Sequence, residues 1–214
     1  KRICFVTGTR AEYGLLKYLM REINLSTSLE LQLVVTGSHL SKRHGYSVNE
    51  IKNDGFIINS CLDIELNEDR NNNVCGSISR CIKLFSDTLE LLQPDLIVVL
   101  GDRYELLAAV TSSMIHRVPI AHIHGGEITE GAFDDGIRHA ITKLSHLHFV
   151  AAEEYKTRVI QLGENPDFVF NVGGLGVDAI KKIKLLSKKE LEDSLGLKFK
   201  KKNLLITYHP LTIP

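Results

Sequence analysis

The segment LIVVLGDRYE, residues 96–105, decides how this 214-residue chain is expected to fold. Its five apolar residues, Leu96 to Leu100, predict a buried strand, and residues 106–109, rich in leucine and alanine, predict that a helix follows. Ligands of open α/β sheets bind outside the carboxyl ends of the strands. Asp102 and Arg103 stand at such an end, so the sequence predicts that both side chains project into a site.

The same arrangement recurs after the strand-like residues 118–120. The sequence AHIHGGE, residues 121–127, brings His124 and Glu127 to a glycine-containing turn at the end of the next strand. Two neighbouring strand ends are therefore expected to carry an acid, a base and a cation.

Short apolar runs alternate with longer amphipathic segments along the chain. Strands are predicted near residues 2–7, 31–36, 56–60, 95–100, 118–123, 147–150, 168–172 and 203–207, and helices near 12–24, 46–53, 76–92, 104–116, 134–145, 153–162 and 187–195. The polar residues 67–73 predict a mobile loop. This alternation indicates the α/β class, with a Rossmann-like, doubly wound parallel sheet and helices on both faces.

The composition changes towards the end of the chain. Residues 181–202 are rich in lysine, which favours a solvated helical face and linker over a phosphate or partner patch. The strand-like residues 203–207 follow, and residues 208–214 resemble the first turn of a second α/β domain. We therefore expect a Rossmann-like lobe over residues 1–174, and linker helices with the first strand of a truncated second lobe over 175–214.

Charge and hydropathy argue against several classes of protein. The 26 basic and 26 acidic residues give a formal net charge of zero, so no global field favours nucleic acid or an anionic membrane. No apolar run approaches the ~20 residues that span a bilayer, and Lys1-Arg2 precedes an apolar run too short for a signal peptide. A cytoplasmic protein is expected.

Neither a zinc site nor another metal centre is expected from the spacing of the ligand-type residues. The four cysteines form no Cys-x-x-Cys pair and are interpreted as reduced thiols. His139, His146 and His148 do not share a compact ligand face on the predicted helix.

The first loop, TGTRAEYG at residues 7–14, connects the first predicted strand to the first predicted helix. Backbone N–H groups and a helix N-terminus bind phosphates at this position in many α/β folds, and an arginine such as Arg10 offers bidentate contact. The spacing after Gly8 does not match the dinucleotide fingerprint G-x-G-x-x-G. A merely structural turn is an equal alternative.

Taken together, these motifs resemble those of the UDP-N-acetylglucosamine 2-epimerase family. Residues 7–14, 101–105, 122–127 and 134–139, followed by His209-Pro210, occur in the family's order and cover nearly the whole chain. The resemblance is greatest to the hydrolysing branch, which forms N-acetylmannosamine for sialic acid synthesis. It implies a two-lobed fold like that of the B-type glycosyltransferases, with the UDP-sugar between the lobes. It also implies no cofactor and a full-length homo-oligomer, for which the 76–92 helix offers an interface.

The chemistry that the resemblance implies is removal of the proton on carbon 2 of the sugar and anti elimination of UDP. Water then adds to the resulting glycal. Carried over by position, Asp102 and Asp134 are the catalytic carboxylates and His209 lies by the phosphates. The UDP-sugar contacts fall on Arg10, Gly14, Arg103 and His209. Glu127, His209 and His124 complete the candidate catalytic set.

His124 departs from the family pattern, because many members have glutamate there in His-x-Glu-Gly-Gly. Imidazole can replace an acid/base carboxylate, since its ordinary pKa of ~6.5 lets it give and take protons near neutrality. The identity of the base is therefore open.

Structural roles remain as alternatives for the carboxylates. Asp102 could only cap the following helix, and Glu127 could only form a salt bridge within its loop. Asp134 could face the cleft while Asp135 caps its helix, or the two could exchange roles.

Four other functions also stay open. They are an epimerase for a UDP-diacetamido sugar of the legionaminic acid pathway, a non-hydrolysing 2-epimerase, a glycosyltransferase of the same fold, and a nucleotide-sugar sensor without turnover.

Overall fold

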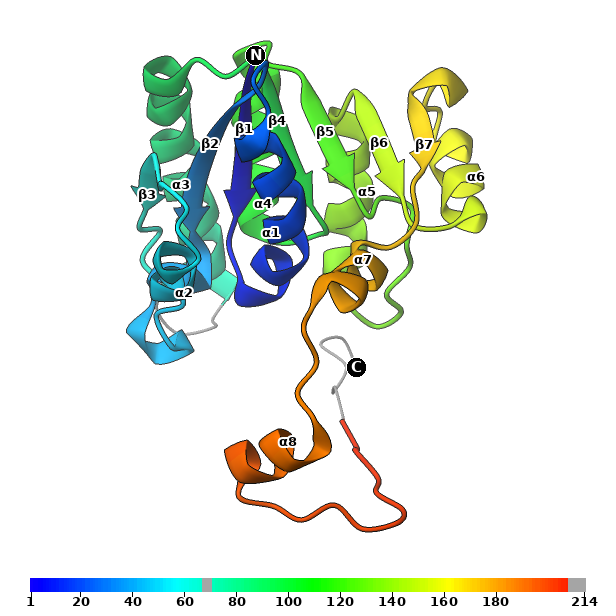
Figure 1. Ribbon diagram of the computed structural model, residues 1–214. Helices are drawn as coiled ribbons and strands as arrows, with labels where there is room; N and C mark the ends of the chain where they lie inside the picture. Colours follow the sequence, from blue (N-terminus) through cyan, green and yellow to red (C-terminus); the bar gives the residue numbers. More distant parts are fainter. Residues whose placement is uncertain (67–70, 208–214) are drawn as a thin grey trace.

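The computed structural model describes residues 1–66 and 71–207 (Figure 1). Its strands form one parallel sheet in the order β3-β2-β1-β4-β5-β6-β7. The strands are β1 (Arg2–Thr7), β2 (Glu30–Thr36), β3 (Ser60–Leu62), β4 (Leu96–Leu100), β5 (Ile120–Ile123), β6 (Leu147–Val150) and β7 (Val169–Asn171). The order reverses between β1 and β4, which is the switch point where doubly wound folds bind ligands. The predicted α/β class and the adjacency of the strands before Asp102 and His124 are confirmed.

Helices cover both faces of the sheet. One face packs against α1 (Arg10–Leu25), α2 (Val48–Asn53) and α7 (Leu175–Lys182), and the other packs against α3 (Asn71–Leu92), α4 (Tyr104–Ile115) and α5 (Asp134–Leu144). The short α6 (Glu153–Gln161) lies beside β6 and β7. Three 3₁₀ turns complete the described part: Gly37–Leu40, Lys42–His44 and Pro166–Phe168.

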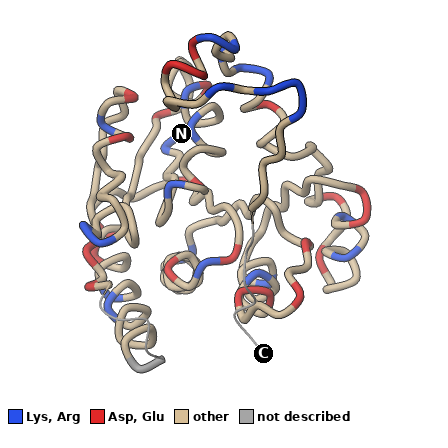
Figure 2. The backbone as a smooth tube through the Cα atoms, turned by 90° about the horizontal axis from the view of Figure 1, so that it is seen from below, with Lys and Arg blue, Asp and Glu red and all other residues tan. Residues whose placement is uncertain are grey.

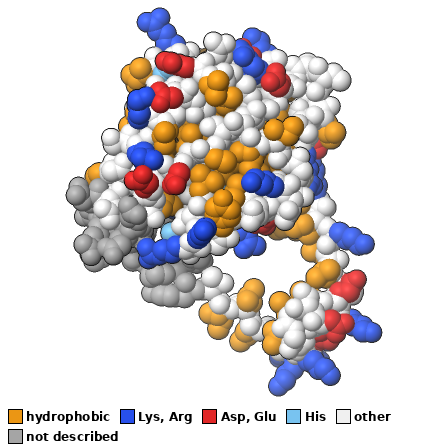
Figure 3. All heavy atoms as spheres, turned by 90° about the vertical axis from the view of Figure 1, so that its left-hand side faces the viewer, with side chains coloured by type: hydrophobic (Ala, Val, Ile, Leu, Met, Phe, Trp, Pro, Cys, Tyr) orange, Lys and Arg blue, Asp and Glu red, His pale blue; other side chains and the backbone are white. Residues whose placement is uncertain are grey.

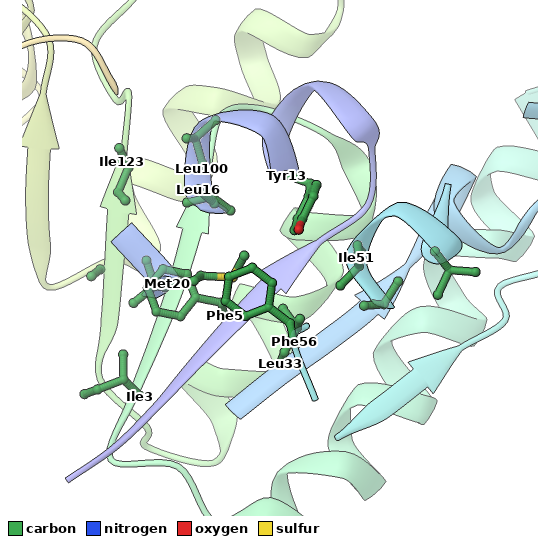
Figure 4. Packing of buried hydrophobic residues seen from close by; sticks show 14 residues of the cluster. Ile3, Phe5, Tyr13, Leu16, Met20, Leu33, Ile51, Phe56, Leu100 and Ile123 are labelled. Carbon is green, nitrogen blue, oxygen red and sulfur yellow. The ribbon is translucent and has the colours of Figure 1, made fainter. Parts of the chain in front are cut away.

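Alternation along β1 explains why two layers of helices are needed. Ile3 and Phe5 belong to the apolar cluster on the α1 face, whereas Cys4 and Val6 belong to the cluster on the opposite face. Figure 4 shows the first cluster, where Tyr13, Leu16 and Met20 of α1 lie over the sheet. Burying each large apolar side chain stabilises the fold by about 1.5–3 kcal/mol.

Two predicted boundaries are wrong. The predicted strand 56–60 is displaced to Ser60–Leu62, because Phe56 and Ile58 pack onto the core before the chain reaches its pairing register with β2. The predicted loop ends earlier than expected, because α3 begins at Asn71, and residues 67–70 lie outside the described part.

The predicted strand 203–207 is also wrong. Leu204 and Leu205 are more than nine-tenths exposed, and within the described residues this segment pairs with no strand of the sheet. An apolar segment becomes a strand only where a neighbouring strand accepts its backbone hydrogen bonds. Residues 208–214, and with them His209, lie outside the described residues.

The linker helices expected after residue 174 are present as α7 and α8 (Lys188–Leu195). Helix α7 packs against α1, and an ion pair between Lys182 and Glu22 joins them at 2.9 Å. Helix α8 stands away from the sheet (Figures 1 and 3). The division of the chain at residue 174 stays a prediction.

Figure 2 shows basic and acidic residues interspersed over most of the helices and loops. None of the helices in the described ranges is long and apolar enough to cross a membrane.

Candidate active site

The ends of β4 and β5 are held together by a buried histidine. Nε2 of His122 lies 2.8 Å from the carbonyl oxygen of Gly101, and Nδ1 lies 3.1 Å from the hydroxyl of Thr142 on α5. Burial lowers the pKa of His122 to about 3, so the ring is neutral. A neutral ring that donates from Nε2 and accepts at Nδ1 satisfies both partners. His122 therefore fixes the position of the two strand ends that carry Asp102 and His124.

Arg138 of α5 connects the carboxylates that follow these strands. Its Nη2 binds Oδ2 of Asp102 and lies 3.0 Å from the hydroxyl of Thr129, and its Nη1 lies 3.0 Å from Oε2 of Glu127. The guanidinium is 7% exposed. Asp102 uses its carboxylate for this contact and does not cap α4, whose N-cap is Arg103. The capping alternative for Asp102 is thus contradicted.

Sequence reasoning assigned no role to Arg138, although a signal was present. Arg138 follows Asp134 by four residues, and residues at that spacing share one face of a helix. A helix that directs Asp134 at the strand ends therefore directs an arginine at the same place.

His124 follows β5 directly and joins the same group of side chains. Its Nδ1 lies 2.9 Å from Oε1 of Glu127, and its Nε2 is buried without a partner among the described residues. The backbone of His124 has φ of +64°, a left-handed conformation that costs a residue with a side chain about 1 kcal/mol or more. The next turn needs glycine, because a Cβ at Gly126 would lie 2.5 Å from the carbonyl oxygen of Tyr155.

Glu127 bridges Arg138 and His124 with its two carboxylate oxygens. Burial raises the pKa of Glu127, but the hydrogen bonds and charges of His124 and Arg138 outweigh burial and hold it below its ordinary value. Asp102, Arg138, Glu127 and His124 thus form one continuous chain of contacts.

Asp134 and Asp135 occupy different environments at the start of α5. Oδ1 of Asp135 accepts a hydrogen bond from the backbone N–H of Thr129 at 2.9 Å. Burial, and then the charge of Asp102, raise the pKa of Asp134 above its ordinary value. The N-cap of α5 is Phe133, without a side-chain cap bond, so neither aspartate caps the helix. Asp134 is the aspartate whose pKa the charge of Asp102 affects.

The residues predicted to contact UDP are distributed around the first loop. Arg10 begins α1, is 77% exposed and pairs with Glu50 at 3.2 Å. Gly14 lies in the same helix, with open space where a Cβ would be. Nε of Arg103 lies 2.8 Å from Oε1 of Glu105.

Glu12 occupies the N-terminus of α1 with its own carboxylate. Its oxygens accept hydrogen bonds from the N–H of Gly8 at 2.9 Å and from the hydroxyl of Thr9 at 3.0 Å. Burial, and then the charge of Glu105, raise the pKa of Glu12 to about 7. The N–H of Gly8 is therefore already paired within the chain, and Arg10 is the cation that this turn offers to solvent.

A pH-dependent effect on stability is expected from Glu12. Its pKa is higher in the folded chain than in the unfolded chain, so its contribution to stability is fully present below about pH 4.5 and is lost as pH rises to 7. Glu12→Gln lacks this loss. We expect the free energy of unfolding of the variant, relative to that of the parent protein, to be higher at pH 8 than at pH 5 by roughly 1–3 kcal/mol, because one pKa unit is worth about 1.4 kcal/mol. Thermal unfolding at the two pH values measures this difference. An equal difference at both pH values would contradict the assignment.

Comparison with known proteins places this arrangement in a family. Residues 21–213 match the family model described as UDP-N-acetylglucosamine 2-epimerase. The chain is 46% identical over 213 residues to the GDP/UDP-N,N′-diacetylbacillosamine 2-epimerase (hydrolyzing) of Campylobacter jejuni, an alignment of 100% of this chain and 55% of that protein. It is 40% identical over 213 residues to the polysialic acid biosynthesis protein P7 of Escherichia coli, with 100% and 54% aligned. The chain spans about half the length of these curated relatives.

Solved structures show the same fold. The crystal structure of the UDP-GlcNAc 2-epimerase from Neisseria meningitidis bound to UDP-GlcNAc aligns with a TM-score of 0.78 and 21% identity, over 92% of this chain and 53% of that one. The predicted fold, one lobe of a B-type glycosyltransferase-like architecture, is confirmed. The family match and the two relatives together show that the chain belongs to the UDP-N-acetylglucosamine 2-epimerase family.

Proposed function

We propose that this chain supplies the catalytic lobe of a hydrolysing 2-epimerase for UDP-2-acetamido sugars. The observation that carries the proposal is the chain of contacts from Asp102 through Arg138 and Glu127 to His124, with Asp134 beside it, at the switch point of the sheet. Carboxylates and an imidazole grouped around one arginine suit proton transfer, and a site that only binds phosphate gains nothing from them.

In the proposed reaction, a base of this group takes the proton from carbon 2 of the sugar. The electron pair of that C–H bond forms the double bond to carbon 1, and the bond from carbon 1 to the β-phosphate oxygen breaks with release of UDP. Water then adds its hydroxyl to carbon 1. A proton adds to carbon 2 from the face opposite to the one that lost its proton, which gives the free 2-epimeric sugar. The second step needs a proton donor, and a carboxyl such as Asp134, whose pKa is raised, holds a proton more readily than an ordinary one.

The names of two relatives suggest two candidate substrates. The 46% identical relative is named for GDP/UDP-N,N′-diacetylbacillosamine, which favours a diacetamido sugar for this chain. The relative named for polysialic acid biosynthesis, at 40% identity, favours UDP-N-acetylglucosamine and formation of N-acetylmannosamine for sialic acid. The cation side chains Arg10 and Arg103 would contact the UDP that both substrates share.

Solvent labelling tests the proposed reaction. We expect the full-length enzyme in deuterated water, given each UDP-sugar without an acceptor, to release UDP and a free sugar that carries deuterium at carbon 2. Comparison of kcat/KM for the two substrates assigns the sugar.

Each alternative gives a different result in that experiment. UDP release only after addition of an acceptor would indicate a glycosyltransferase, and an epimerised sugar that remains attached to UDP would indicate a non-hydrolysing enzyme. Binding of both UDP-sugars without any turnover would indicate a sensor.

A further inference from the structure

Glu105 is a carboxylate that the proposed reaction does not use, and it is fully buried. It lies in the first turn of α4, and its side chain is 0% exposed. Its Oε1 lies 2.8 Å from Nε of Arg103, and its Oε2 is buried without a hydrogen-bond partner in the described part of the chain. A buried charge is costly unless a partner compensates it, and the ion that does so here is Arg103.

The loops after β1 and β2 close directly over this carboxylate. A Cβ added to Gly8 would lie 2.5 Å from Oε1 of Glu105, and a Cβ added to Gly37 would lie 2.7 Å from the same atom. The Glu105 side chain therefore lies directly beneath the first loop, between the ends of β1, β2 and β4. This enclosure leaves the carboxylate little freedom to move, so the direction of its contact with Arg103 is fixed.

The contact uses one of the three nitrogens of the guanidinium. Nε is bound to Glu105, which leaves Nη1 and Nη2, the pair that forms a bidentate fork with a phosphate, outside this contact. Cζ of Arg103 also lies over the ring of Tyr104, 5.3 Å from the ring centroid. The Arg103 side chain is 35% exposed, and its Nε holds it to the buried carboxylate.

Glu12 is the third charged group in this cluster. Its pKa of about 7 is raised by burial and then by Glu105, and lowered in part by Arg103. When Glu12 holds a proton, Arg103 and Glu105 balance one another. Protonated Glu12 therefore adds no second negative charge beside the guanidinium of Arg103, which is paired with Glu105 alone.

We infer that Glu105 is a positioning residue, which holds Arg103 by Nε so that its two terminal nitrogens face the diphosphate of the UDP-sugar. The inference rests on the proposed function, and it adds a residue that touches neither the substrate nor the reacting atoms. An arginine side chain loses rotamer freedom when it is fixed, and prior fixation by Glu105 removes part of that cost from ligand binding.

A double-mutant cycle in the full-length enzyme tests the inference, with UDP as the probe and calorimetry as the measurement. We expect Glu105→Gln to raise the Kd of UDP about tenfold, the scale of one charge-assisted hydrogen bond, when Arg103 is present. In the Arg103→Ala background the same change should alter the Kd less than about twofold. An equal loss in both backgrounds would overturn the inference, because Glu105 would then act only on the fold.

The matched control is Glu164→Gln, which makes the same replacement at another enclosed carboxylate. Glu164 contacts His148 at 3.2 Å and follows α6, away from the first loop. Its substitution is expected to lower the melting temperature without changing the Kd of UDP. A weakened Kd here would show that UDP affinity reports general stability.

Arg103→Lys covers the case in which Glu105→Gln does not fold. Lysine keeps the charge but has no planar fork, so it cannot bind Glu105 through one nitrogen and present two others to a phosphate. We expect the lysine variant to bind UDP within about twofold of Arg103→Ala. Parent-like affinity in the lysine variant would overturn the inference.

The outcome for Arg103→Ala separates this inference from the proposed function. Unchanged UDP affinity there would remove Arg103 from the UDP site and overturn the role of Glu105 with it, whereas solvent labelling would still test the reaction.

Discussion

Asp102→Asn in the full-length enzyme is expected to lower kcat at least about 100-fold, the scale of removing an acid/base group, and to leave the Kd of UDP nearly unchanged. Asparagine retains the size of the side chain but cannot accept a proton at neutral pH. It also weakens the ion pair with Arg138, which lies at the centre of the site. Both effects act on the sugar end of the substrate, so they should appear in kcat and not in UDP binding.

A matched control exists on the same strand. Asp95 directly precedes β4 and Asp102 follows it, so the two lie at opposite ends of this strand. Asp95 accepts a hydrogen bond from the backbone N–H of Arg2 at 2.8 Å and is expected to affect stability alone. Steady-state kinetics of Asp95→Asn should give the parent kcat. If Asp102→Asn kept more than half of the parent kcat, its catalytic assignment would be lost.

Much of the fold could be predicted because its signals are local. The apolar runs that became β1, β2, β4 and β5 are largely buried on both faces, so hydropathy alone locates them. The apolar run at residues 56–60 gave a wrong strand position, because hydropathy reports burial and not strand pairing. Phe56 is buried against the core, but the residues that pair with β2 are Ser60–Leu62. The segment 203–207 misled for a related reason: its composition suits a strand, but pairing depends on a neighbour that hydropathy does not reveal.

The site was predictable only as far as strand ends could reveal it. Asp102 and His124 follow neighbouring strands, and their proximity follows from the order of β4 and β5. The role of Arg138 depends on how α5 lies across those ends, which is a tertiary relation. Glu12 and Glu105 were equally hidden: both stand in quoted motifs, but their burial beneath the first loop depends on the close approach of Gly8 and Gly37. Sequence therefore locates the groups at the ends of elements and misses those that helices carry to them.

The replacement of His124 by alanine is expected to remove most of the turnover, by about 100-fold, if imidazole is an acid/base group of the reaction. The geometry favours His124 as the base rather than the acid of the reaction. Glu127 accepts the hydrogen of Nδ1, which leaves the lone pair on Nε2, and Nε2 is the buried nitrogen that has no partner in the described residues. A carboxylate that fixes the tautomer of an adjacent histidine in this way prepares the other nitrogen for proton transfer.

The pH profile of kcat distinguishes this role from a structural one. A neutral imidazole base loses activity as it takes up a proton, so the parent enzyme should show an acidic limb in its pH profile that the alanine variant lacks. His124→Glu restores the residue that many family members have, and it should keep measurable activity while the limb moves to lower pH. His124 could instead only shape the turn before Gly126, with Asp102 and Asp134 performing all proton transfer. An alanine variant with parent-like turnover and an unshifted profile would establish that alternative. The left-handed backbone at His124 argues against a purely structural role, because alanine would keep the same backbone strain and would lose the contact with Glu127.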